Sequence, residues 1–179
     1  MLFIEGGYDN TPMSCIANEL GLSKAGLYHY FQSKEHLLFL IHEHYMEKYF
    51  IPVLYKAEKI SDPEERIVSF VNSYSNLVTT DAAGRILIHE IVRLKPEHQK
   101  KIRRSWRRGF DLIRDAISEM EISGKSKKLN KTFAAFAAIG MCSWIFYWFD
   151  YSRKESSKEL LETFVEILLK GILKDGEKL

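Results

Sequence analysis

The chain has few residues that interrupt helices. Its 179 residues include only 10 glycines and 4 prolines, the two residue types that most strongly break helices and form turns. Leucine, isoleucine, lysine and glutamate occur throughout the chain. Hydrophobic residues make up 46% and charged residues 28%, which is typical of a globular protein with enough apolar material for a core. The scarcity of breakers predicts an all-α protein.

Cysteine is also scarce, and its positions argue against a disulfide. Cys15 and Cys142 lie far apart and form no CxxC pattern. We expect two free, buried thiols in a reducing compartment. No secretory signal precedes Gly6, so a cytoplasmic location is predicted.

Motifs for catalysis and metal binding are lacking. His89-Glu90 begins the pattern of a zinc-protease helix, but Arg93 stands where the second histidine belongs. His42 and His44 are two residues apart, so they face different sides of a helix. There is no glycine-rich phosphate loop and no nucleophile-elbow motif. We therefore expect no enzyme, no cofactor and no metal.

One uncharged segment has nearly the length of a membrane span. Residues 132–149 carry no charged side chain, and about 20 apolar residues are needed to cross a bilayer. The segment stands alone and is flanked by amphipathic stretches on both sides. We expect a helix buried within the protein, and no membrane partner.

Two helix starts lie close together in residues 22–37. Ser23 and Ser33 can each act as an N-cap, because a serine hydroxyl accepts a hydrogen bond from a free N–H of the first helical turn. Residues 24–30 between the two caps are too few to form a stable helix alone. Small residues at its start and aromatic residues with polar tips further on suit a helix that contacts another molecule.

A second predicted helix precedes this one. Thr11 is expected to N-cap it, with Pro12 at the first helical position, and Gly21 is expected to end it. Ile16 and Leu20 are four residues apart and would form its buried face. A helix, a short turn with glycine and a second helix form the helix-turn-helix pattern of DNA-binding proteins.

At this point the sequence resembles the N-terminal domain of the tetracycline-repressor (TetR) family of bacterial transcription regulators. The match is nearly continuous over roughly the first 40 residues and rests on Gly7-Tyr8, Thr11, Ile16-Ala17, Gly21-Leu22-Ser23-Lys24, Leu27-Tyr28-His29-Tyr30-Phe31, Ser33-Lys34-Glu35 and Leu37-Leu38. The resemblance implies a two-domain, all-helical homodimer that binds palindromic operator DNA and is released by a small ligand. Residues 1–45 would form the DNA-binding domain and residues 46–179 the effector-binding and dimerisation domain.

The sequence also departs from the family pattern at its beginning. Family members usually carry a basic arm and a full first helix before the residues that match Leu2-Phe3, and here Met1 stands almost directly before them. Residues 1–45 contain two lysines against five carboxylates, a net charge of −3, whereas DNA attracts positive charge. One alternative is therefore a small-molecule-binding protein that has lost DNA binding with its first helix.

Several residues of this domain are candidates to contact DNA. Lys24 can bond guanine, Ala25 can touch a thymine methyl group, and Gly26 allows close approach in the major groove. The resemblance supports phosphate contacts by Tyr28, His29 and Lys34. The full set of remaining candidates, which would bond phosphates or support the helix start, is Thr11, Ser23, Tyr28, His29 and Lys34. We expect Tyr30 and Phe31 to be packing residues.

Six further helices are predicted along the chain. Ser33 begins a helix that reaches about Tyr49 and is bent or ended by Pro52. The others are expected at residues 63–78, 81–94, 96–122, 130–149 and 156–173, the first of them capped by Asp62 with Pro63 at its first position.

The later helices are rich in aromatic residues that suit an apolar ligand pocket. The candidate ligand-binding residues are Tyr74, His89, Arg93, Trp106, Phe110, Phe136, Trp144 and Trp148. Residues 95–108 also contain seven basic side chains, which form either a solvated face or a phosphate-binding stripe. Residues 88–108, with Gly140-Met141 and Trp144 to Trp148, resemble family members that sense acyl-coenzyme A thioesters. An acyl-CoA, a free fatty acid or a planar apolar compound is therefore the expected effector.

The last two helices are the expected dimer surface, because together they carry more apolar surface than one chain can cover. The candidate interface residues are Phe146, Leu160, Leu161, Phe164, Ile167 and Leu168. A monomer that buries both helices internally is the alternative. Together these features predict a homodimeric repressor that an apolar effector releases from operator DNA.

Overall fold

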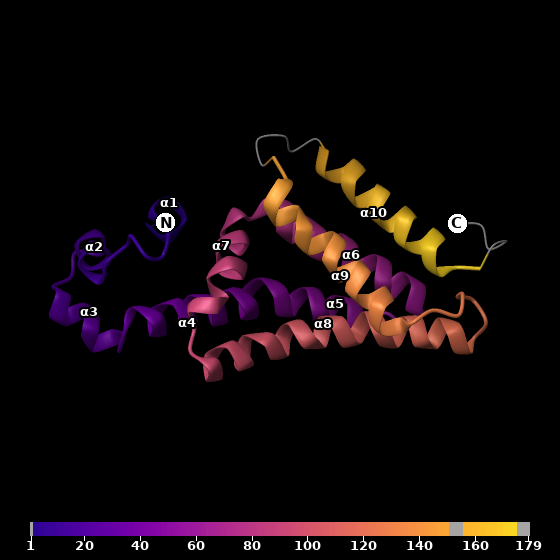
Figure 1. Cartoon of the computed structure of the whole chain (residues 1–179), viewed down its shortest axis with the longest axis horizontal. Coiled ribbons are helices and arrows are strands. Elements are labelled where there is room, and N and C mark those ends of the chain that lie inside the picture. The colour runs from indigo at the N-terminus through magenta and orange to yellow at the C-terminus, as the bar shows by residue number, and fades with distance from the viewer. Residues whose placement is uncertain (1, 151–155, 175–179) are drawn as a thin grey trace.

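The computed structural model describes residues 2–150 and 156–174, and these residues form an elongated, helical molecule without β-strands (Figure 1). This confirms the predicted all-α class. The helices are α1 (Leu2–Gly6), α2 (Met13–Glu19), α3 (Lys24–Tyr30), α4 (Lys34–Tyr45), the π-helical segment η1 (Met46–Phe50), α5 (Ile51–Glu58), α6 (Pro63–Thr80), α7 (Ala82–Glu90), the 3-10 turn η2 (Ile91–Arg93), α8 (Pro96–Ile122), α9 (Lys131–Trp148) and α10 (Ser156–Ile172).

The first four helices form one end of the molecule, and we call residues 2–45 the head. Gly7 and Gly21 have φ angles of 73° and 66°, the left-handed conformation in which glycine commonly ends a helix. The Ser23 hydroxyl accepts the Gly26 N–H at 3.0 Å and caps α3. The head has a small core of its own, made by Met13, Ile16, Ala17, Leu27 and Leu37. The predicted helix-turn-helix is therefore present as α2 and α3.

Thr11 does not have the predicted role. Its hydroxyl donates to the carbonyl oxygens of Gly7 at 2.7 Å and Leu2 at 3.3 Å, and α2 begins at Met13 without a side-chain cap. Thr11 is also only 4% exposed. Its hydroxyl is therefore engaged within the turn after α1, contrary to the predicted N-cap and phosphate contact.

The helix that carries the head continues further than predicted. Pro52 does not end it, because the chain passes through η1 and continues as α5 to Glu58. Proline lacks an N–H and clashes with the preceding turn of an α-helix, and the wider π-helical hydrogen bonding of Met46–Phe50 lies directly before it. The boundary proposed after residue 45 coincides with the start of this π-helical segment.

Helices α5 to α10 form the body, which has one large core. Asp62 caps α6 by accepting the N–H groups of Glu64 and Glu65, and Asn130 caps α9 by accepting that of Phe133. Figure 1 shows α8 along one edge, α9 crossing beside α6, and α10 on the opposite side. Of the predicted buried thiols, Cys142 is buried in this core and Cys15 is exposed.

The uncharged segment forms α9, whose inner face packs into the body through Ala135, Ala138, Cys142 and Ile145. Across residues 2–150 and 156–174, no helix combines the length and apolar character that crossing a membrane requires.

Candidate nucleic-acid interface and ligand cavity

The outer surface of α3 presents most of the residues predicted to contact DNA. Ser23, Lys24, Ala25, Tyr28 and His29 are exposed, and Gly26 is half-buried. The helix is seated on α2 by Leu27, which is fully buried. A seven-residue helix held on its inner side in this way leaves its outer side free to enter a groove of DNA.

The exposure of Tyr30 differs from the prediction. It is 66% exposed, whereas we expected a packing aromatic. Its ring lies 5.6 Å from that of His29 in an edge-on arrangement. Because α3 has so few residues, only Leu27 is buried within it. Tyr30 therefore joins the exposed side chains near this surface, and its exposure was not evident from the sequence.

Lys34 contacts the head itself. Its ammonium group lies 4.3 Å from the centre of the Tyr8 ring and donates to the carbonyl oxygen of Asp9 at 3.3 Å. The side chain thus fixes the turn after α1 against the start of α4. An ammonium group has three donors, so this contact leaves donors for the predicted phosphate contact.

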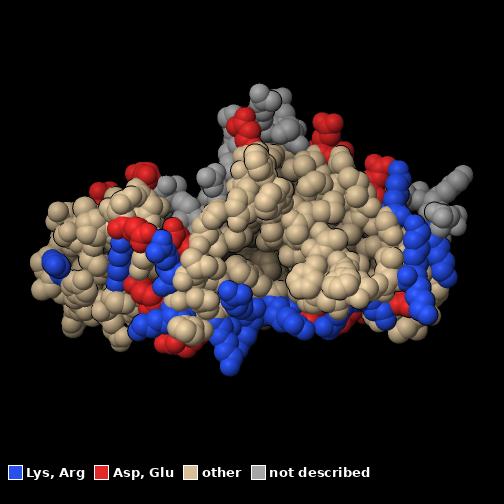
Figure 2. All heavy atoms as spheres, viewed as in Figure 1, with Lys and Arg blue, Asp and Glu red and all other residues tan. Residues whose placement is uncertain are grey.

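The carboxylates of the head lie mainly toward the body. Asp9 pairs with Arg93 at 2.5 Å, and Glu43 pairs with Lys101 of α8. Glu35 accepts the backbone N–H of Lys95 at 2.9 Å. Figure 2 shows acidic and basic atoms side by side where the head meets the body. Three of the five carboxylates in the head therefore lie toward the body. They are directed away from α3, the helix at which negative charge would repel DNA most strongly.

Glu35 has the most developed of these contacts. Its Oε1 also accepts from Nδ1 of His98 at 2.7 Å, and the His98 ring stacks on Phe39 with a centroid distance of 3.9 Å. Burial raises the pKa of Glu35, but the hydrogen bonds from Lys95 and His98 outweigh it, so the pKa lies below its usual value. Glu35 is therefore a charged anchor between the first turn of α4 and the first turn of α8.

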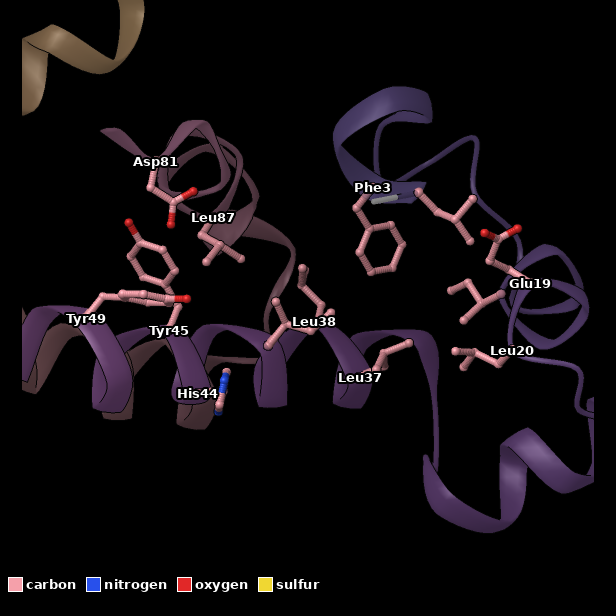
Figure 3. Close-up of a pocket in the computed structure, with 13 residues that line it drawn as sticks. Phe3, Glu19, Leu20, Leu37, Leu38, His44, Tyr45, Tyr49, Asp81 and Leu87 are labelled. Carbon is pink, nitrogen blue, oxygen red and sulfur yellow. The ribbon is translucent and has the colours of Figure 1, made fainter. Parts of the chain in front are cut away.

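An apolar groove of about 500 Å³ lies between the head and α7 (Figure 3). Phe3 and Leu20 line it from α1 and the end of α2, Tyr45 lines it from α4, and Leu87 lines it from α7. Leu20 is 58% exposed, so its predicted burial beside Ile16 is not observed.

A second cavity, of about 140 Å³, lies inside the body between α8 and α9. Its lining residues are Phe50, Tyr74, Ile88, Trp106, Ile139 and Ser143. The Tyr74 hydroxyl and the Ser143 hydroxyl are 3.2 Å apart. Burial raises the pKa of Tyr74 to about 12, so the phenol stays neutral and can donate or accept a hydrogen bond. The cavity is thus apolar with one polar pair, which suits a small organic ligand.

Basic side chains of α8 lie beside this cavity. Figure 2 shows a hollow on this face of the molecule with Lys and Arg atoms along its lower side, over α8. Lys100, Arg103, Arg104 and Arg107 line a shallow surface depression on the same helix. Arg107 pairs with Asp111, whereas Lys100, Arg103 and Arg104 form no ion pair with a carboxylate in residues 2–150 and 156–174. This part of α8 can therefore attract an anionic group.

The structure brings together only some of the predicted ligand-binding residues. Tyr74 and Trp106 line the cavity, and Phe110 is half-buried against Phe136 at 4.8 Å. Arg93 pairs with Asp9 instead, and the exposed His89 meets the Tyr147 ring at 4.8 Å.

Three predicted ligand-binding aromatics lie on the outer face of α9. Phe136, Trp144 and Trp148 are 61%, 60% and 75% exposed, so their predicted place in the pocket is wrong. The cavity uses Ile139 and Ser143 of that helix instead. Sequence reasoning missed Ile88, Ile139 and Ser143 because aliphatic and small side chains carry no ligand signal of their own. It missed Phe50 because that residue precedes the aromatic-rich later helices.

The predicted dimer residues also divide between two faces. Phe146 and Leu168 are buried in the chain's own core, at 2% and 7% exposure, so their predicted interface role is wrong. Ile167 is 56% exposed. Leu160, Leu161 and Phe164 are half-buried on α10. The outer face of α9 carries five exposed aromatic side chains, Phe133, Phe136, Trp144, Tyr147 and Trp148.

The sequence and fold were compared with known proteins. Residues 61–172 match the family model described as "Tetracyclin repressor-like, C-terminal domain", and residues 1–41 match that of bacterial regulatory proteins of the tetR family. The HTH-type transcriptional regulator HbdR of Aromatoleum sp. (strain CIB) is 22% identical over 174 residues, covering 96% of this chain and 76% of HbdR.

Two solved structures share the fold along nearly the whole chain. AibR in complex with isovaleryl coenzyme A and operator DNA is 30% identical, with a TM-score of 0.86, and the match covers 94% of this chain and 92% of AibR. PfmR from Thermus thermophilus is 26% identical, with a TM-score of 0.86 and coverage of 97% of this chain and 95% of PfmR.

Proposed function

Because the chain belongs to the TetR family of transcription regulators, we propose that it is a homodimeric repressor that an acyl-coenzyme A thioester releases from operator DNA. The observation that carries this proposal is the apolar cavity beside the basic side chains of α8. An acyl-CoA has an apolar acyl group and a phosphorylated head. These two parts match the cavity and the basic surface, respectively.

The size of the cavity favours a short acyl group. Its volume of about 140 Å³ equals that of roughly five water-sized groups at ~30 Å³ each. A branched or linear chain of four or five carbons fills this space, whereas a long fatty acyl chain requires the body helices to separate. The similar AibR was solved with isovaleryl coenzyme A, which has an acyl group of this size.

The exposed surface of α3 supports DNA binding. Lys24 stands in its first turn, near the bases that a recognition helix reaches in the major groove. The carboxylates Asp9, Glu35 and Glu43 are held by the body. The surface that would meet DNA is therefore less negative than the head as a whole.

The outer face of α9 is the surface that we propose for the second copy of the chain. Its exposed aromatic residues, with Ile167 of α10, form a broad apolar face, and such faces are commonly covered by a partner. A two-fold dimer places two heads at a fixed spacing, which matches the symmetry of a palindromic operator. An effector then acts by its different affinity for the two head spacings.

A salt-dependent gel shift tests the DNA-binding part. The full chain is expected to prefer the DNA that flanks its own gene over a random duplex. Lys24→Ala should weaken this binding by about 1–3 kcal/mol, and Lys158→Ala on the exposed surface of α10 should not change it. Equal affinity for both duplexes indicates instead a ligand-binding protein without operator recognition.

Calorimetry with acyl-CoA thioesters tests the effector. Isovaleryl-CoA is expected to bind more tightly than free coenzyme A or a long-chain acyl-CoA. Ile139→Trp fills the cavity and should abolish this difference, whereas Ile122→Trp, at a side chain that is 85% exposed, should preserve it. Equal binding of isovaleryl-CoA and free coenzyme A contradicts the proposed acyl site.

A further inference from the structure

His42 belongs to the head and is fully buried where α4 meets α7, a helix that forms part of the wall of the body cavity. It lies on α4 and has 0% exposure. Its Nδ1 is 2.8 Å from the carbonyl oxygen of Leu38, in the same helix, and its Nε2 is 2.6 Å from the carbonyl oxygen of Leu87, in α7. The imidazole thus connects the helix that carries the head to a helix that lines both the groove and, through Ile88, the cavity.

The neutral imidazole of His42 has one N–H proton, but both of its nitrogens face a hydrogen-bond acceptor. Both partners are carbonyl oxygens, which only accept, and a neutral imidazole has a single N–H. Burial lowers the pKa of His42, although its backbone contacts and Glu90 oppose this, so the neutral ring is the main form at neutral pH. One nitrogen therefore donates, and the lone pair of the other faces an oxygen.

The geometry assigns the proton to Nε2. The Nε2 contact is the shorter one, and Leu87 lies in the last turn of α7, where the carbonyl groups carry the negative end of the helix dipole. Leu38 lies inside α4, away from such an end. The ring therefore makes one hydrogen bond between the two helices, from His42 Nε2–H to the Leu87 carbonyl.

We infer that His42 is a positioning residue that transmits movement of the cavity wall to the DNA-binding head through the Leu87 carbonyl. Ile88, the residue after Leu87, lines the cavity with Tyr74 and Trp106. A ligand that displaces Ile88 also displaces the Leu87 carbonyl. Because N–H···O bonds rarely exceed about 3.2 Å and this one is 2.6 Å long, a shift of more than about 0.6 Å either breaks the bond or draws α4 along.

His42 lies far enough from the start of α4 that a movement at His42 can change the direction of the helix. His42 lies eight residues after Lys34, which is about 12 Å along the helix. The start of α4 follows α3 after three residues, and α8 holds the first turn of α4 through Glu35 and its last turn through Glu43. A small movement at His42 therefore changes the direction of the head. This role rests on the proposed effector site in the body.

Three variants separate hydrogen bonding from space filling. His42→Gln keeps a donor near the Nε2 position, whereas His42→Met fills similar space without a donor. His42→Asn has a donor only near the Nδ1 position and is the second test if the Met variant does not fold. His44→Met is the matched control, because His44 is exposed and lies two residues further along the same helix.

The first measurement is amide hydrogen exchange in the free, full chain, without ligand or DNA. Loss of the bond should speed exchange in the last turn of α7 about tenfold in His42→Met and His42→Asn, relative to α6 in the same sample. His42→Gln should restore it to within about threefold, and His44→Met should leave it unchanged. Unchanged α7 exchange in both variants that lack the Nε2 donor overturns the inference.

The second measurement is the ratio of DNA affinities without and with isovaleryl-CoA. This ratio should fall at least fivefold in His42→Met and recover in His42→Gln. If wild type responds to isovaleryl-CoA and the ratio is the same in His42→Met, the inference is wrong. If wild type itself does not respond to isovaleryl-CoA while α7 exchange changes as described, the proposed effector fails and the α4–α7 connection stands. An imidazole ¹⁵N spectrum that shows the Nδ1–H tautomer also contradicts the assignment.

Discussion

The head and the body are stabilised in different ways. The core of the head consists of five buried residues, whereas the body has a continuous core that extends over all its helices. The head is also held by contacts to the body: Leu38, Phe39 and Tyr45 of α4 belong to the core of the body, and among the ion pairs that of Glu35 with His98 is the most buried. A small core cannot hold three short helices by apolar burial alone, so the stability of the head depends on the body.

This difference has a functional meaning. An element that must change direction when a ligand binds belongs to the less stable part of a protein. The head and the body also share buried apolar contacts, because Leu38, Phe39 and Tyr45 of α4 belong to the core of the body. The polar contacts at Glu35, Glu43 and His42 are further places where ligand binding can influence DNA binding.

The largest expected effect comes from matched core substitutions. Leu27 in the head and Ile113 in the body are both 0% exposed, and truncation to alanine costs about 2–5 kcal/mol at such sites. Leu27→Ala should unfold α1–α3 while the body stays folded, whereas Ile113→Ala should lower the melting temperature of the whole body. Hydrogen exchange resolved by helix distinguishes the two. Equal loss of protection in both regions in Leu27→Ala contradicts separate stabilities.

Glu35→Gln tests the polar connection, with an expected loss of about 1.5 kcal/mol in the stability of the head. The pKa of Glu35 is lower in the folded chain. Its contribution is therefore fully present above about pH 4.3 and is lost as the pH falls through the lower folded value. Denaturant unfolding from pH 7 to pH 3 should show a smaller acid-induced loss in the variant than in wild type.

The control for this experiment is Glu47→Gln, which neutralises an exposed carboxylate further along the same continuous helix. Its pH dependence should follow wild type. If Glu35→Gln and Glu47→Gln behave alike, Glu35 does not anchor the head.

The smallest expected effect comes from matched helix caps. Ser23 caps the seven-residue α3 and Asn130 caps the 18-residue α9, and loss of an N-cap costs about 1 kcal/mol. Ser23→Ala should increase exchange throughout α3, because so short a helix has no stable remainder. Asn130→Ala should affect only the first turn of α9. Fraying confined to the first turn of α3 contradicts this view of the head.

Much of the head was predictable because its signals are local. Ser23 and Gly21 act on neighbouring backbone groups, so their roles follow from position in the chain. Thr11 shows the limit of this reasoning. Its hydroxyl has two local options, and the close approach of α1 selects the carbonyl oxygens of Gly7 and Leu2.

The sites in the body were less predictable. Trp144 and Trp148 were expected in a ligand pocket because they are aromatic, yet the rotation of α9 places them outside and places Ser143 inside. A helix with apolar residues on every side gives no periodic signal for its inner face. Only the packing of α9 against α6 and α8 determines which side is buried.

The sequence alone determined the helical class, the helix-turn-helix and most helix ends, because these depend on backbone preferences and on caps within a few residues. The tertiary structure decided which apolar residues line the cavity and which carboxylates of the head meet the basic side chains of α8. It also placed His42 against the Leu87 carbonyl, 45 residues away in the chain. Such contacts depend on the relative positions of distant helices, which arise from the packing of the whole core and not from any local pattern.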